Sequence, residues 1–159
     1  MTLRCWSTSD LNRKFRRWQN GMVTTERTLL QIAVTTASLV PISAGFAGAV
    51  LGASFLGWLD DATFDGRALD SHIRYLSALL FGIGVGFLLA VPDIEHHRRR
   101  FTLLTAIVFV GGLARLGGLA ASGVPHRGMV FGLVMELIIT PLLWVWQQRF
   151  AARCEPRTD

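Results

Sequence analysis

Long apolar stretches without charge alternate with short charged segments along this chain. No charged residue occurs between Thr28 and Leu59 or between Tyr75 and Pro92. Two later stretches carry one charge each, Arg115 in the first and Glu136 in the second. A helix needs about 20 mainly apolar residues to cross a hydrocarbon layer of about 30 Å. The pattern therefore predicts four transmembrane helices, at about residues 28–50, 71–91, 101–122 and 129–150.

The fold class that follows is an all-α integral membrane four-helix bundle. Only 17% of the 159 residues are charged, against about 25% in soluble domains. The predicted helices are apolar on every face, whereas helices at the surface of a soluble protein are amphipathic. We expect one membrane domain, residues 27–150, between a basic leader, residues 1–26, and a polar tail, residues 151–159.

The leader has the pattern of an amphipathic helix. Leu11, Phe15, Trp18 and Met22 recur at helical spacing, with basic residues between them. Such a helix lies in the membrane interface, with its basic side chains on anionic headgroups. The alternative is a disordered basic tail that only sets topology. The residues expected at the membrane surface are Arg13, Lys14, Phe15, Arg16, Arg17 and Trp18.

The distribution of arginine and lysine predicts the orientation. Twelve of these residues fall in the leader, the second connection and the C-terminal segment, and only Arg67 and Arg127 fall in the other connections. Basic residues concentrate on the cytoplasmic side of a membrane. We expect a multi-pass protein of the inner (cell) membrane with both termini in the cytoplasm. Topology also explains the net charge of +5, so no nucleic-acid partner is expected.

Arg115 and Glu136 are the two charges that need an explanation inside the membrane. They are equally far along the chain from the middle of the turn that joins the last two predicted helices. With a rise of about 1.5 Å per residue, both should lie at one depth and pair across the helix seam. Arg74, predicted at a slightly shallower depth, would leave a local excess of positive charge. The cluster is either structural, fixing helix register, or a site for a lipophilic anion.

Glycines accompany these charges. Gly82 and Gly86 form a G-x-x-x-G pattern, which is typical of close helix contacts. Gly132 lies one turn before Glu136. Close helix packing is therefore predicted at Gly82, Gly86, Gly111, Gly112, Gly118 and Gly132.

The sequence has no recognised catalytic motif. His96 and His97 adjoin three arginines, as in a solvated turn, and no nucleotide-binding glycine loop or H-E-x-x-H motif occurs. Cys5 and Cys154 stand in neither a metal-ligand nor a redox spacing. We expect no catalytic residue, metal or cofactor.

Three short polar islands carry a resemblance to a known family. They are Leu69–Tyr75 (LDSHIRY), Gly111–Leu116 (GGLARL) and Glu136-Leu137 before Pro141. From about Leu29 to Phe150 the chain resembles an uncharacterised family of small bacterial membrane proteins, domain of unknown function 4345. The resemblance implies a four-helix membrane protein with Arg74, Arg115 and Glu136 as shared polar positions, and it implies no activity. The leader looks longer than this family's core requires.

Three functions are compatible with these features. The first is a non-catalytic accessory subunit of a larger membrane complex, held to a membrane-protein partner or to another copy of itself. The second is a binding protein or enzyme for a lipophilic anion or lipid, with Arg74 and Arg115 as the charge clamp and Glu136 as a base. A small transporter is third, because four helices leave little room for alternating access.

Overall fold

The computed structural model describes residues 8–56, 66–122 and 127–154, with side chains for 23–55, 66–121 and 127–154. Four long helical segments make up this part of the chain. The first three are α1 (Thr8–Leu51), α2 (Gly66–Leu88) and α3 (Arg98–Ser122). A short 3₁₀ turn, η1 (Gly52–Leu56), follows α1. The fourth segment consists of α4 (Arg127–Val134), the π-helical turn η2 (Met135–Ile139) and α5 (Thr140–Cys154).

All four predicted membrane helices are present. The segments long and apolar enough to cross a membrane are Val23–Phe55, Gly66–Leu88, Arg98–Ala121 and Arg127–Cys154. Hydrocarbon offers no hydrogen-bond partner to a backbone N–H or C=O. Helices are therefore expected, because a helix makes these hydrogen bonds within its own segment. The prediction of an all-α, four-helix membrane bundle is confirmed, and the chain is a multi-pass membrane protein.

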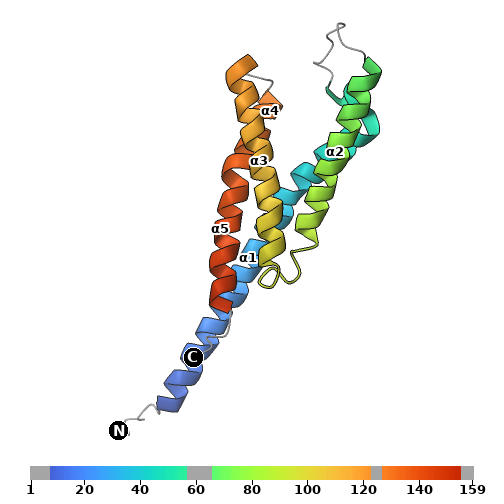
Figure 1. The fold of residues 1–159 in the computed structure, drawn as a ribbon. Coiled ribbons are helices and arrows are strands. Elements are labelled where there is room, and N and C mark those ends of the chain that lie inside the picture. The colour runs from blue at the N-terminus through green and yellow to red at the C-terminus, as the bar shows by residue number, and fades with distance from the viewer. Residues whose placement is uncertain (1–7, 57–65, 123–126, 155–159) are drawn as a thin grey trace, which may run out of the picture.

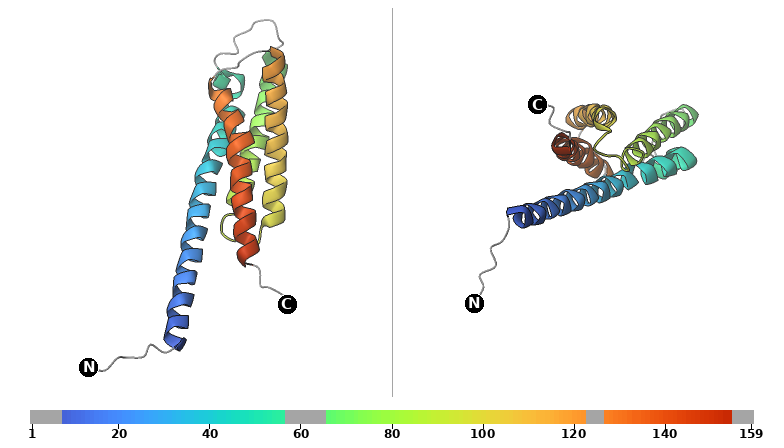
Figure 2. Two further views of the ribbon diagram at one scale, coloured as in Figure 1. Left: turned by 90° about the vertical axis from the view of Figure 1, so that its left-hand side faces the viewer. Right: turned by 90° about the horizontal axis from the view of Figure 1, so that it is seen from below.

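The described part of the basic leader is helical. α1 runs without interruption through 44 residues, about 66 Å, so residues 8–26 of the leader continue the helix of the first span, and the interfacial position of the leader stays a prediction. Its N-terminal part projects beyond the other helices (Figure 2). The physical reason is that no proline precedes Pro41, so nothing in residues 8–40 forces the helix to end. The predicted surface residues, Arg13 to Trp18, lie outside the described side chains.

α1 and α2 form a tightly packed antiparallel hairpin. A Cβ atom at Gly45 would lie 2.5 Å from the backbone nitrogen of Phe81, and one at Gly84 would lie 2.7 Å from Cγ1 of Ile42. Glycine is required here because the two backbones approach too closely for any side chain. η1 begins at Gly52, whose φ of 64° lets the chain leave the helix in the left-handed conformation.

The second hairpin, formed by α3 with α4, η2 and α5, meets the first at one end only. There an apolar cluster joins both hairpins: Leu30, Val34, Phe87, Ile94, Phe101 and Phe150. The rings of Phe87 and Phe101 pack edge to face, with centroids 5.0 Å apart. We call this the closed end (residues 26–34, 86–104 and 144–153). At the opposite, open end (residues 49–56, 66–82, 111–122 and 127–136), α2 and α3 diverge (Figure 1).

The glycine contact between α1 and α2 generates a stability prediction. Gly45→Ala should lower the free energy of unfolding by about 1–3 kcal/mol, because its methyl group forces the two backbones apart. Heat unfolding of the purified protein in detergent measures this effect. Gly82→Ala is the matched control, since a Cβ there meets nothing within 4 Å. Equal stability of the two variants would contradict the packing described for Gly45.

Candidate functional site

Arg115 on α3 and Glu136 on η2 form one ion pair. Nε of Arg115 donates to Oε2 of Glu136, and Nη2 donates to Oε1, both at 3.1 Å. These two parallel hydrogen bonds are the geometry in which a guanidinium binds a carboxylate most strongly. The side chain of Glu136 is 17% exposed and that of Arg115 is 39% exposed. The pair therefore lies at the edge of the α3–η2 seam and not at its centre.

The helix carrying Glu136 is widened at this point. Pro141 has no N–H for the carbonyl of Leu137, and its ring would clash with that carbonyl in a regular α-helix. The chain adopts a π turn instead, in which the backbone N–H and the hydroxyl of Thr140 both reach the carbonyl of Met135. Such single π turns are frequent at functional sites. Here the wider turn presents Glu136 to α3.

Two glycines shape the seam around the ion pair. A Cβ at Gly112 would lie 3.0 Å from Cβ of Glu136 and 2.7 Å from Cδ2 of Leu137. A Cβ at Gly132 would lie 4.0 Å from Nη1 of Arg115. Gly112 therefore allows α3 and η2 to approach, and Gly132 leaves room beside the guanidinium.

The other predicted glycines lie elsewhere. Gly86 faces Leu104 of α3, with its Cβ position 3.2 Å from a Leu104 methyl carbon. A Cβ at Gly82, Gly111 or Gly118 would meet nothing within 4 Å. Within the single chain these three glycines therefore face open space, and close packing at them stays a prediction for contacts with another molecule.

Arg74 does not join the ion pair of Arg115. Its Nε donates to Asp70 at 2.7 Å, and its Nη1 donates to the carbonyls of Ala49 and Val50 at 3.0 and 2.6 Å. Asp70 in turn accepts the backbone N–H of Ala53 at 2.8 Å. Arg74 thus satisfies the last carbonyls of α1, a favourable place for a cation. Each of the two arginines has its own carboxylate, so the described contacts form no local excess of positive charge.

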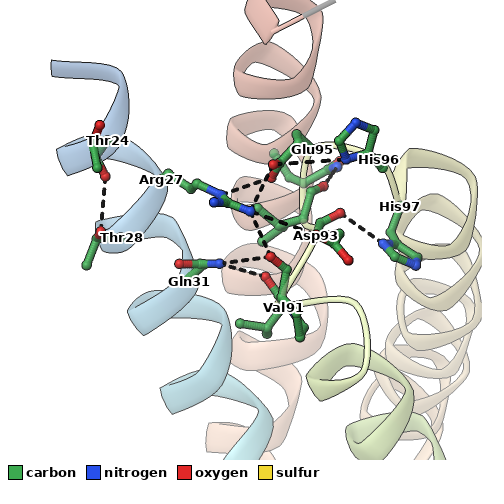
Figure 3. A network of polar contacts seen from close by, with 12 residues as sticks. Thr24, Arg27, Thr28, Gln31, Val91, Asp93, Glu95, His96 and His97 are labelled. Atoms are coloured by element: carbon green, nitrogen blue, oxygen red, sulfur yellow. Dashed lines mark hydrogen bonds and ion pairs between the residues drawn. The ribbon is translucent and has the colours of Figure 1, made fainter. Parts of the chain in front are cut away.

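A polar layer at the closed end was missed by the sequence analysis (Figure 3). Arg27 of α1 contacts Glu95 at 2.9 Å through Nη2, and the same nitrogen donates to the carbonyl of Pro92 at 2.8 Å. Gln31, one turn further along α1, donates to the carbonyl of Val91 at 2.9 Å. These side chains therefore bind the turn between α2 and α3 to α1.

The same polar layer includes α5. The fully buried Gln147 donates to the carbonyl of Ile94 at 2.7 Å. Glu26 accepts hydrogen bonds from Arg153 and from the indole of Trp146. Glu26 and Glu95 each stand in a basic segment of the sequence. They were the signal that could have revealed this layer, since an acidic residue among arginines is expected to pair with one of them.

The chemistry available to these groups is limited. Among the described side chains, no group of three His, Cys, Asp or Glu residues could hold a metal ion. His97 contacts the carbonyl of Asp93 at 2.9 Å, and His96 lies 4.0 Å from Glu95. The two histidines belong to the rim of the polar layer. The Arg115–Glu136 pair offers hydrogen-bond donors to another molecule, from the part of the guanidinium that Glu136 leaves uncovered.

The ion pair predicts an unequal response to single and double substitution. Arg115→Met should destabilise the protein by roughly 1–3 kcal/mol, because it leaves the Glu136 carboxylate unpaired in apolar surroundings. The double variant Arg115→Met/Glu136→Met removes both charges and should recover most of that loss. The midpoint of heat unfolding in detergent compares the variants. A double variant no more stable than Arg115→Met would refute this account of the pair.

Comparison with known proteins gives one match. The profile of the family described as Domain of unknown function (DUF4345) matches residues 29–147. Neither the curated proteins nor the solved structures include a match. The matched region extends into all four membrane helices, includes Arg74, Arg115 and Glu136, and begins after the basic leader, residues 1–26. This chain belongs to the DUF4345 family, whose function is uncharacterised.

Proposed function

We propose that this protein is a non-catalytic accessory subunit of a larger complex in the inner membrane, with both of its ends in the cytoplasm. The observation that carries the proposal is that the single chain does not form a complete helix bundle. Its two hairpins share a core at the closed end only. At the open end α2 and α3 diverge (Figure 1), and no residue from 127 to 146 is buried.

Exposed leucines are normal in a membrane protein, because lipid tails cover them as well as protein does. Exposed glycines are different. Because they have no side chain, they allow the backbone of a neighbouring helix to approach closely, whereas lipid tails need no such gap in the surface. α3 presents three of them, Gly111, Gly117 and Gly118, with nothing within 4 Å of the Cβ position. These glycines support docking of a helix from another subunit.

The second candidate function, an anion-binding site with Arg74 and Arg115 as its charge clamp, has less support. It depended on two arginines around one glutamate, and the described contacts give Arg74 a carboxylate of its own, Asp70. A guanidinium paired with a carboxylate has no net charge with which to attract an anion. An enzyme also has less support, because Glu136, the residue offered as its base, is held in the ion pair with Arg115.

The accessory role predicts a stable assembly in native membranes. A C-terminally tagged chain, expressed at its natural level and extracted in mild detergent, should elute well above the size of one chain with its detergent. Mass spectrometry should find a second membrane protein at fixed stoichiometry. In spheroplasts the tag should resist external protease, as the orientation requires. A lone monomer after gentle extraction would contradict the accessory role.

A further inference from the structure

The closed end carries arginines that the polar layer does not use. Arg27 contacts Glu95 there at 2.9 Å, and Arg153 contacts Glu26. Among the described side chains, no carboxylate lies within 4.0 Å of three further arginines, which are Arg99, Arg100 and Arg149. These arginines therefore add positive charge that no described carboxylate balances.

Arg99 and Arg149 lie at nearly the same level of the membrane. Nε of Arg98 donates to Oε1 of Gln148 at 3.0 Å, and each of the two arginines follows one partner of this hydrogen bond by one residue. The span Arg98–Ala121 has 24 residues and is about 36 Å long, whereas the hydrocarbon layer is about 30 Å thick. The ends of this span therefore reach the lipid headgroups, and Arg99 and Arg149 lie at the depth of a phosphate.

The two arginines also point to the same side of the seam between α3 and α5. Each is two residues from a fully buried side chain, Arg149 from Gln147 and Arg99 from Phe101. Two residues turn a helix by about 200°, which leads to its opposite side. Both guanidinium groups are therefore directed away from the core, and the outer face of the seam carries one arginine from each helix.

Exposed apolar side chains continue this outer face toward the centre of the membrane. Leu103 lies one turn beyond Arg99 on α3 and is 62% exposed. Leu142 lies two turns before Arg149 on α5 and is 61% exposed. A molecule on this face thus meets two cations at the headgroup level and apolar side chains below them. A phospholipid has its groups in this order, whereas an acidic peptide has no acyl chain to place on the leucines.

We propose that the outer face of the α3–α5 seam binds one anionic phospholipid, with its phosphate between Arg99 and Arg149 and its acyl chains along Leu103 and Leu142. Guanidinium N–H groups donate to phosphate oxygens in a bidentate geometry. A zwitterionic lipid is bound less well, because its own cation would lie close to these arginines. This site goes beyond the accessory role and requires no partner subunit.

Native mass spectrometry of the delipidated full chain tests the site. Dioleoylphosphatidylglycerol and dioleoylphosphatidylcholine, which have the same acyl chains, are added in equal amounts. Each arginine near a membrane surface favours an anionic lipid about fivefold, so the wild-type chain should retain the phosphatidylglycerol at least about tenfold better. Equal retention of the two lipids, or retention of neither, would overturn the proposal, even if a partner subunit is found in native membranes.

Three variants locate the binding site. Arg99→Gln and Arg149→Gln should each reduce the preference for phosphatidylglycerol about fivefold. Arg100→Gln is the matched control, because it removes the same charge from the next residue. Arg100 is two residues from Arg98, which faces α5, so it lies on the opposite side of α3 and its loss should leave the preference unchanged. Equal losses in Arg99→Gln and Arg100→Gln would indicate a general attraction to the basic end of the protein and reject the site.

Discussion

The polar layer at the closed end is the interaction on which the rest of the architecture depends. Each hairpin holds itself together, the first through close backbone contact at Gly45 and Gly84 and the second through the seam at Gly112. The two hairpins are joined where Arg27, Gln31 and Gln147 bind the turn between α2 and α3. Hydrogen bonds to carbonyls in a turn are valuable there, because those carbonyls have no helical partner. The divergence at the open end follows from this one-ended attachment.

The open end is exposed because the two hairpins are joined at the closed end only. α2 and α3 separate beyond Gly86 and Leu104, so Arg115 and Tyr75 stay exposed and do not share a core. Arg74 and Arg115 are each paired with a carboxylate of their own hairpin, Asp70 and Glu136 respectively.

The sequence predicted much of the fold, because the length of an uncharged stretch follows from the thickness of the bilayer. It also predicted that Arg115 and Glu136 lie at one depth. It could not place Arg74, because depth alone does not say which hairpin a residue contacts. G-x-x-x-G spacing pointed to Gly82 and Gly86, whereas Gly84 between them faces α1. Tertiary contacts decide how a helix is rotated about its own axis. The spacing of glycines along one helix does not specify those contacts.

Attachment of the hairpins at one end is tested most directly by distances between spin labels in lipid bilayers. One pair, Leu89→Cys with Leu103→Cys, spans the closed end, and a second, Leu76→Cys with Leu116→Cys, spans the open end. All four side chains are exposed, so labels fit without repacking. Cys5 and Cys154 are first replaced by serine. The account predicts a clearly longer distance for the open-end pair. Equal distances would mean that the hairpins pack along their whole length, and would contradict it.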